Sequence, residues 1–190
     1  MKEGLIKDAY ELIIKEIQAV ISISYVVAVG IGMMFSYKKY SEFDIDIFDY
    51  GDIFDFLMTP FSEIYVLTFS LLSIFFVFIL FKLDSIWKRK WPRSYSFLNF
   101  GMDKRSWFGL YRNGMFLISA MLYLYLSATI YGKYAKEKVL NQKEITVRLV
   151  DNEVKTGKLI GKTNNVIFLL KKEDVYAIPI SSLVKEIKIR

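Results

Sequence analysis

Long runs of apolar side chains dominate the first two thirds of the chain. Three of them, 17–37, 61–81 and 107–131, carry almost no charge over about twenty positions, the length that an α-helix needs to cross about 30 Å of hydrocarbon. Pro60 directly precedes the second run, as a helix-start residue can. The alternative, three helices buried in a soluble core, needs more covering chain than the rest of the sequence supplies. The pattern therefore predicts a transmembrane domain over 17–132 with three crossings.

The segments on either side of this domain have different patterns. Residues 1–16 place apolar side chains at helical spacing and charges on the other faces, which predicts an amphipathic interfacial helix. Residues 133–143 are lysine-rich and predict a helical linker. From 144 to 190 apolar and polar residues alternate between turn residues, which predicts five short strands. The expected fold class is therefore a membrane protein of α plus small all-β type, ending in an SH3-like or Sm-like β-barrel.

Small side chains recur along the first and third apolar runs. Lipid tails are as apolar as leucine, so helices associate in a membrane through close backbone approach, which small residues permit. This pattern favours either a homo-oligomer or packing of the three helices within one subunit, and the sequence leaves both open. The residues concerned are Ser24, Ala28, Gly32, Gly114, Ala120, Ser127, Ala128 and Ala135.

Between the first two runs, aspartates interrupt an aromatic and apolar segment every two or three positions. Five carboxylates exclude an ordinary crossing, because each is costly in hydrocarbon. Their spacing does not match a calcium-binding loop. A solvated surface segment is the favoured interpretation, and an acidic vestibule that concentrates cations is the alternative. The aspartates are Asp44, Asp46, Asp49, Asp52 and Asp55.

Between the second and third runs, cations alternate with tryptophans. This combination is typical of the lipid headgroup zone, where indole rings sit at the interface and cations meet anionic lipid. Nucleic-acid binding also uses basic and aromatic residues, but the proximity of two membrane ends disfavours it. The predicted headgroup residues are Trp87, Lys88, Arg89, Lys90, Trp91, Arg93, Lys104, Arg105 and Trp107.

The amino-acid composition excludes several kinds of catalytic and metal site. The chain of 190 residues is 54% hydrophobic and contains no cysteine and no histidine. Thiol and imidazole catalysis and Cys/His zinc sites are therefore excluded. Serine and threonine lack a histidine partner and no phosphate-binding glycine loop occurs, so we expect no enzyme, no cofactor and no metal. The charged first sixteen residues and the lack of a small-residue cleavage site also predict that the first apolar run is retained.

Positive charge predicts the orientation. The N-terminus and the second loop together carry more Lys and Arg than the opposite side, and positively charged short loops stay in the cytoplasm. We therefore expect a multi-pass protein of the cell membrane with a cytoplasmic N-terminus and the β module outside.

A bundle ending in a small-residue-rich third helix, followed by a β module containing Val175-x-x-Ile178-Pro179, resembles the membrane half of small-conductance mechanosensitive channels. The likeness covers an arrangement and a few residues. The chain departs from that family in three respects: it has no Gly/Ala-dense pore helix, it has no large second cytoplasmic domain, and its charge pattern predicts the opposite orientation. The resemblance implies a channel, but it does not assign the chain to the family.

These observations lead to three functional hypotheses. The leading one is a non-catalytic, oligomeric membrane sensor, anchor or effector whose β module assembles or binds a partner, an architecture used by effectors of bacterial antiviral defence. The second is an ion channel or pore lined by the third helix. The third is an adaptor subunit that recruits a protein partner through an edge of the β module. The bilayer is the expected partner in all three, and nucleic acid is not.

Overall fold

The computed structural model describes residues 2–180 and 184–188, with side chains from residue 16 onward. The helices are α1 (Lys2–Ser41), α2 (Ile53–Ser62), α3 (Ile64–Lys90), α4 (Pro92–Leu98) and α5 (Phe108–Asn141), with short 3-10 turns η1 (Ile47–Asp49) and η2 (Met102–Lys104). The strands are β1 (Ile145–Leu149), β2 (Val154–Lys162), β3 (Val166–Lys171), β4 (Asp174–Pro179) and β5 (Val184–Lys188).

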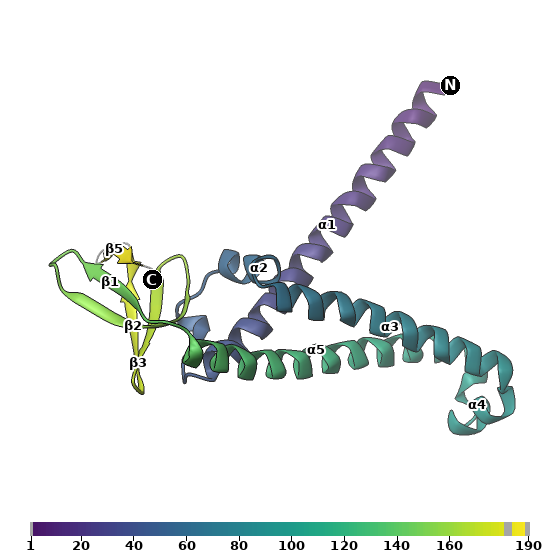
Figure 1. Cartoon of the computed structure of the whole chain (residues 1–190). Helices are drawn as coiled ribbons and strands as arrows, with labels where there is room; N and C mark the ends of the chain where they lie inside the picture. The colour runs from purple at the N-terminus through teal and green to yellow at the C-terminus, as the bar shows by residue number, and fades with distance from the viewer. Residues whose placement is uncertain (1, 181–183, 189–190) are drawn as a thin grey trace.

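Helices α3 and α5 lie antiparallel and form a long hairpin (Figure 1). The sheet sits at one end of this hairpin, and α4 sits at the other end. Helix α1 meets the hairpin near the sheet and then diverges from it, so its N-terminus lies far from both. Along the chain, α1 runs toward the sheet, α3 runs away from it and α5 returns. The N-terminus and α4 are therefore both on the side remote from the sheet.

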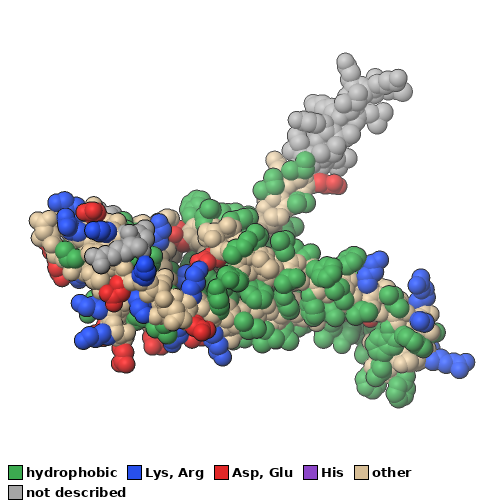
Figure 2. Space-filling view, viewed as in Figure 1, with side chains coloured by type: hydrophobic (Ala, Val, Ile, Leu, Met, Phe, Trp, Pro, Cys, Tyr) green, Lys and Arg blue, Asp and Glu red, His purple; other side chains and the backbone are tan. Residues whose placement is uncertain are grey.

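Three helices are long and apolar enough to cross a membrane: Glu16–Ser41, Ile64–Lys90 and Phe108–Asn141. Their outer faces are covered with apolar side chains (Figure 2). Ile74 of α3 is 70% exposed and Val26 of α1 is 68% exposed, values expected of residues whose solvent is lipid rather than water. The interfacial segment predicted at 1–16 continues without a break into the first of these helices, and the predicted linker 133–143 is largely the last part of α5.

The predicted start of the second crossing at Phe61 is wrong by three residues. Pro60 does not open this helix, because it lies inside α2, which ends at Ser62. Glu63 adopts an extended conformation, and α3 begins at Ile64. Pro60 has no N–H to donate to the Phe56 carbonyl, so it removes one hydrogen bond in the last part of α2. The break therefore falls after Pro60, where the backbone turns from α2 into α3.

The three long helices share a small core near the sheet. Phe35 of α1 and Val66 of α3 are fully buried, and Tyr131 of α5 packs its ring 5.6 Å from that of Phe35. Ala128 and Ala135 complete this core on α5. Helix α1 is held to the hairpin only in this C-terminal part, which explains why the two diverge beyond it.

The C-terminal module is a five-stranded antiparallel sheet with the order β4-β3-β2-β1-β5. Register shifts between Leu159 and Gly161 in β2 and between Arg148 and Leu149 in β1 mark bulges, which bend strands and increase twist. The expected five strands are confirmed. Ile167 and Leu169 of β3 belong to a core formed among the strands. The alternate residues Phe168 and Leu170 belong to a second core, which the strands share with the helices. Strand β3 is therefore buried on both faces.

Candidate functional site

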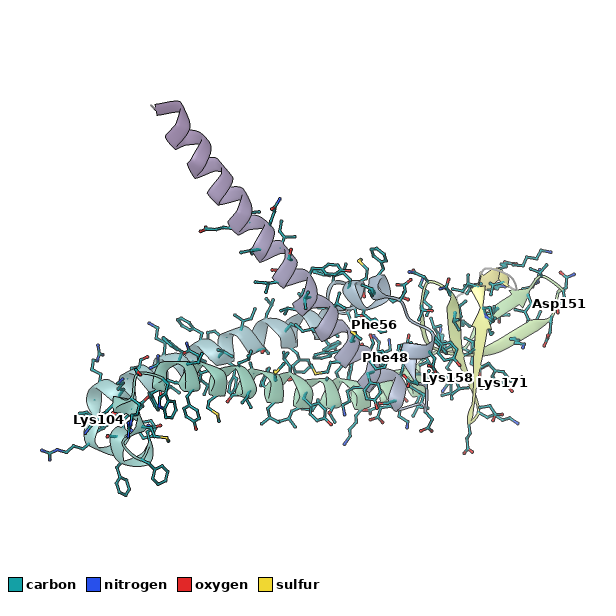
Figure 3. The ribbon with its side chains drawn as sticks, turned by 180° about the vertical axis from the view of Figure 1, so that it is seen from behind. Phe48, Phe56, Lys104, Asp151, Lys158 and Lys171 are labelled. Atoms are coloured by element: carbon teal, nitrogen blue, oxygen red, sulfur yellow. The ribbon has the colours of Figure 1, made fainter. Side chains whose placement is uncertain are left out.

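The ends of several helices converge on one face of the sheet. Their buried side chains form a single cluster with residues of β2 and β3, so helices and sheet share one hydrophobic core. Figure 3 labels Phe48 and Phe56 on the helical side of this region and Lys158 on the sheet. We call this region the junction. Its buried members are Tyr40, Phe43, Ile45, Ile47, Phe56, Val139, Ile160, Phe168 and Leu170.

Phe168 is the aromatic side chain of the sheet that contacts the helical part most directly. It is 1% exposed, and its ring centroid lies 5.4 Å from that of Tyr40 and 5.2 Å from that of Tyr50. Both pairs are edge-to-face, a geometry that contributes about 1 kcal/mol beyond burial. Gly161 of β2 faces the same tyrosine, and a Cβ at this position would overlap the Tyr40 hydroxyl. The sheet therefore fits closely against α1.

Two aspartates at the start of α2 bind the loop between β2 and β3. Asp52 accepts the backbone N–H of Asp55 at 2.9 Å and Asp55 accepts that of Asp52 at 3.1 Å, which is a capping box. Their other oxygens accept from Asn164: its backbone N–H donates to Asp55 and its side-chain amide to Asp52, both at 3.0 Å. The bond from Asn164, and next that from the Asp55 backbone, lower the pKa of Asp52 below its usual value.

The end of α5 is tied to β2 by two further hydrogen bonds. The Gln142 side-chain amide donates to the Leu159 carbonyl, and the Lys158 ammonium donates to the Leu140 carbonyl. The second bond satisfies a carbonyl in the last turn of the helix, which has no helical donor. Helix α5 is therefore joined to the sheet both by covalent continuity and by direct contacts.

A cavity of about 460 Å³ lies in the junction, lined by α1, α2, α5 and the β2–β3 loop. Lys39 and Glu63 form an ion pair of 3.2 Å within it, and the hydroxyls of Ser36 and Thr59 lie 3.1 Å apart. Apolar side chains of α2 and β2 also line the space. Small-molecule sites commonly have this size and occur where domains meet, but here the polar groups bond to one another.

Two glycines permit the helices to meet at the junction. A Cβ at Gly32 would overlap the Phe56 carbonyl oxygen of α2. This carbonyl lacks its usual helical donor, because the residue four positions on is Pro60. A Cβ at Gly132 of α5 would lie 2.5 Å from the Lys38 carbonyl oxygen of α1. Both positions therefore require the absence of a side chain.

The predicted small residues divide into two groups. Gly32, Ser127, Ala128 and Ala135 are buried where α1 meets α2 and α5, so they pack helices within this chain. The others lie outside that contact. Ser24 is exposed, Ala28 and Ala120 are half-buried, and a Cβ at Gly114 would meet no atom within 4 Å.

Three of the five predicted vestibule aspartates cap helices, and the other two do not. Asp52 and Asp55 cap α2 and bind Asn164, as described above. Asp46 accepts the Phe48 N–H and caps η1. Asp44 has a φ of 58° at the turn after α1, a conformation in which aspartate is tolerated, and Asp49 is exposed. No group of three or more His, Asp or Glu side chains suited to a metal ion occurs in the part of the chain that the structure describes.

The predicted headgroup residues lie together at the end of the hairpin remote from the sheet. We call the segment from Trp87 to Trp107, which includes α4 and η2, the tip; Figure 3 labels Lys104 in it. The tip is attached to the hairpin through Tyr95, whose hydroxyl donates to Asp84 at 3.4 Å. Asp84 also pairs with Arg112 of α5 at 3.4 Å. Burial, and next the Asp84 charge, raise the pKa of Tyr95.

Sequence reasoning missed two features. It did not predict that the helices cover the second face of the sheet. The uninterrupted apolar run of β3, Val166 to Leu170, could have indicated this, because a strand exposed on one face alternates. It also did not predict the ion pair between Asp84 and Arg112. Asp84 and Arg112 lie near the same end of two neighbouring apolar runs, which could have indicated a pair.

Comparisons with known proteins add little to this description. No protein-family model matches the chain, and no curated protein matches it. Among solved structures, the chain is similar to the pleiotropic translational regulator Hfq, over 98% of that chain and 32% of this one, with 18% identity and a TM-score of 0.24. This weak likeness supports no conclusion about function.

Proposed function

We propose that this protein is a non-catalytic, oligomeric membrane protein in which the C-terminal module senses or assembles and the helices anchor or deform the bilayer. The observation that carries the proposal is the shared core of the junction. A module joined only by a linker could not pass a displacement to the helices. Here Phe168, Tyr40 and the Asn164–aspartate bonds connect the sheet to α1 and α2. A force on the sheet therefore acts on the helices directly.

Two features support association with further copies of the chain. The sheet has two outer strands, β4 and β5, and outer strands present backbone groups that can pair with another strand. In the membrane part, α1 leaves the hairpin, and Gly30 and Gly114 have open space around them. Small residues on a lipid-facing surface permit close approach of another helix. The bulged sheet also suits a small Sm-like barrel that pairs at both edges.

Mass measurement in detergent tests the oligomer. Light scattering of the purified full-length chain should give a multiple of the single-chain mass. Gly114→Phe should reduce that multiple if this face makes the contact, while Leu110→Phe, at a position already 80% exposed and large, serves as the matched control. A strictly monomeric wild-type protein would contradict the proposal.

The channel hypothesis makes a different prediction. If the acidic segment sets the ion selectivity of a channel, neutralising Asp44 and Asp49 should change that selectivity in planar bilayers. Neither aspartate caps a helix. Asp52 and Asp55 are unsuitable for this test, because their loss also disturbs the junction. An effector that deforms the bilayer should instead give leakage without a fixed conductance.

We also propose that the N-terminus and the tip face the cytoplasm and that the sheet faces outward. The chain direction supports a shared side for the N-terminus and the tip, since the N-terminus and α4 both lie remote from the sheet. The N-terminus and the tip together carry more Lys and Arg than the segments that flank the apolar helices at the opposite end, and such loops remain cytoplasmic. The chain has no native cysteine, so a Glu173→Cys variant labelled in intact cells by an impermeant thiol reagent tests the orientation.

A further inference from the structure

The tip exposes large apolar side chains at the end of the hairpin. Phe100 is 88% exposed and Phe97 is 81% exposed, the highest values among the large apolar side chains that the structure describes. Leu98 between them is 57% exposed. Figure 2 shows this apolar surface flanked by Lys and Arg at the end of the hairpin. We call Phe97, Leu98 and Phe100 the apolar corner.

The apolar corner belongs to a folded segment. Tyr95, on the same helix, is 1% exposed, and its ring contacts those of Trp87 and Phe108 edge-on at 5.4 and 6.2 Å. The Asn99 side-chain amide donates to the Tyr95 carbonyl at 2.8 Å, which closes the helix. Ser96 donates to Asp103 at 2.8 Å and so joins α4 to η2. One face of the tip is therefore fixed on the hairpin, and the opposite face is held outward.

Phe100 also has a strained backbone. Its φ is 52°, in the left-handed region, which costs a residue with a Cβ about 1 kcal/mol or more. A strained conformation that places an aromatic ring in water is unfavourable on both counts. A lipid environment removes the second cost, because the ring then contacts acyl chains.

The cations of the tip have no acidic partner. No ion pair among the described residues involves Lys88, Arg89, Lys90, Arg93, Lys104 or Arg105. Elsewhere in the membrane part Lys39, Arg112 and Lys136 each pair with a carboxylate. A groove of about 830 Å³ adjoins the apolar corner and is lined in part by Arg93 and Lys104. The tip therefore offers free positive charge directly beside exposed aromatic rings.

The depth of the tip matches the headgroup zone. The apolar part of α3 runs from Ile64 to Trp87, with Asp84 as its one acidic residue, and Asp84 is paired with Arg112. Helix α3 ends at Lys90, and α4 folds back so that Tyr95 packs on Trp87 and bonds to Asp84. Helix α4 therefore lies level with the last turns of α3, where the apolar run gives way to cations, and this is the level expected of phosphates and the upper acyl chains.

We propose that the tip is a binding surface for anionic phospholipid. The apolar corner inserts between acyl chains, and Arg93, Lys104 and Arg105 bind the phosphates of negatively charged headgroups. Cations close to an anionic membrane surface are attracted to it within about a Debye length. The protein therefore gathers anionic lipid around one end of its hairpin, and the composition of that leaflet sets how firmly the tip is held.

The chain carries its own reporter for this site. It has three tryptophans, Trp87, Trp91 and Trp107, and all three lie in the tip. The full-length protein is reconstituted in vesicles of phosphatidylcholine and phosphatidylglycerol, with bromines on the chains of one lipid or the other. Bromines quench nearby tryptophan, so the two quenching values compare the lipids around the tip. We expect phosphatidylglycerol to be enriched about fivefold over its bulk share, equivalent to about 1 kcal/mol.

Two sets of variants separate charge from insertion. Arg93→Gln, Lys104→Gln and Arg105→Gln combined should bring the quenching ratio to the bulk value. Phe97→Ser with Phe100→Ser should weaken quenching by both lipids alike, and Val150→Ser, an exposed change in the sheet, should leave it unchanged. Equal quenching by the two lipids in the wild type, or a preference that persists without the three cations, overturns the proposal. So does loss of the preference on adding inorganic phosphate, which would indicate a phosphate site instead of a bilayer surface.

Discussion

The two ends of the hairpin are built from the same kinds of residues but use them in opposite ways. At the junction, aromatic rings are buried against the sheet, and Lys39, Glu63 and Asp55 all have polar partners within the chain. At the tip, Phe97 and Phe100 are exposed, and no ion pair among the described residues involves the surrounding cations. The polar and aromatic groups of the junction have partners within the chain, whereas we propose that those of the tip find theirs in the bilayer.

This difference shows why residue type alone does not assign a role. The sequence of the aspartate-rich segment favours a solvated surface and leaves a cation vestibule as the alternative, yet most of its carboxylates cap helices or hold Asn164. In the lysine- and arginine-rich segment, Lys88 and Lys90 lie over aromatic rings, but none of the described ion pairs involves its cations. The distinction depends on partners, and partners come from the fold. Variants that exchange or remove these partners therefore test the comparison.

The largest expected effect is from Phe168→Ala. It removes a buried ring that contacts Tyr40 and Tyr50, so the free energy of unfolding should fall by about 4 kcal/mol. Thermal unfolding of the full-length chain in detergent measures it, and hydrogen exchange should increase in both α2 and β3. Phe100→Ala is the control at the tip. It removes the same phenyl ring from a position that is 88% exposed, so it should leave the unfolding temperature in detergent almost unchanged.

A second test compares two glycines of α1. Gly32→Ala puts a Cβ against the Phe56 backbone, so α1 and α2 must separate, at a cost of about 2–3 kcal/mol. Gly30→Ala, two residues away on the same helix, meets nothing within 4 Å and should be neutral or slightly stabilising. Equal effects of the two substitutions would show that close packing at the junction does not limit stability.

A third test concerns the ion pair between Asp84 and Arg112, which joins α3 to α5 beside the tip. Asp84→Asn leaves Arg112 half-buried without its partner, and we expect a loss of about 1–2 kcal/mol, less than for a fully buried pair because both side chains retain some exposure. A double-mutant cycle with Arg112→Met isolates the interaction. Strict additivity of the two single changes would mean that the pair does not fasten the tip to the hairpin.

Much of the fold follows from the sequence. The three apolar helices could be predicted because about twenty uncharged residues admit few other structures, and the five strands because their period is two. The docking of the sheet could not be derived in the same way. It depends on Gly161 of β2 meeting the Tyr40 hydroxyl of α1, just as the packing of α1 on α2 depends on Gly32 meeting the Phe56 carbonyl, and the partners are distant in sequence. Local periodicity carries no information about such contacts.

The candidate sites also divide into those formed by neighbours in sequence and those that only the fold brings together. The headgroup residues of the tip lie together because they are neighbours in sequence, so their grouping was predictable. Asp52 and Asn164 are brought together by the fold, and nothing in the spacing of either segment indicates the other. The apolar corner also escaped sequence reasoning, because Phe97 and Phe100 fit equally well into a buried turn. Only the structure shows that Tyr95 takes the buried position instead.

The smallest effect concerns the polar contact of the junction and its pH dependence. The pKa of Asp52 is lowered in the folded chain, first by the Asn164 amide, so this group stabilises the fold above its unfolded pKa of about 3.9 and loses that contribution as the pH falls through the folded value. Asn164→Ala should therefore lower the unfolding temperature near neutral pH, and the difference from wild type should shrink on acidification below the unfolded pKa. Asn165→Ala, the adjacent exposed change, controls for the loop itself. A gap between wild type and Asn164→Ala that stays constant through the acid range would show that the Asn164 side chain acts through the loop conformation and not through the Asp52 carboxylate.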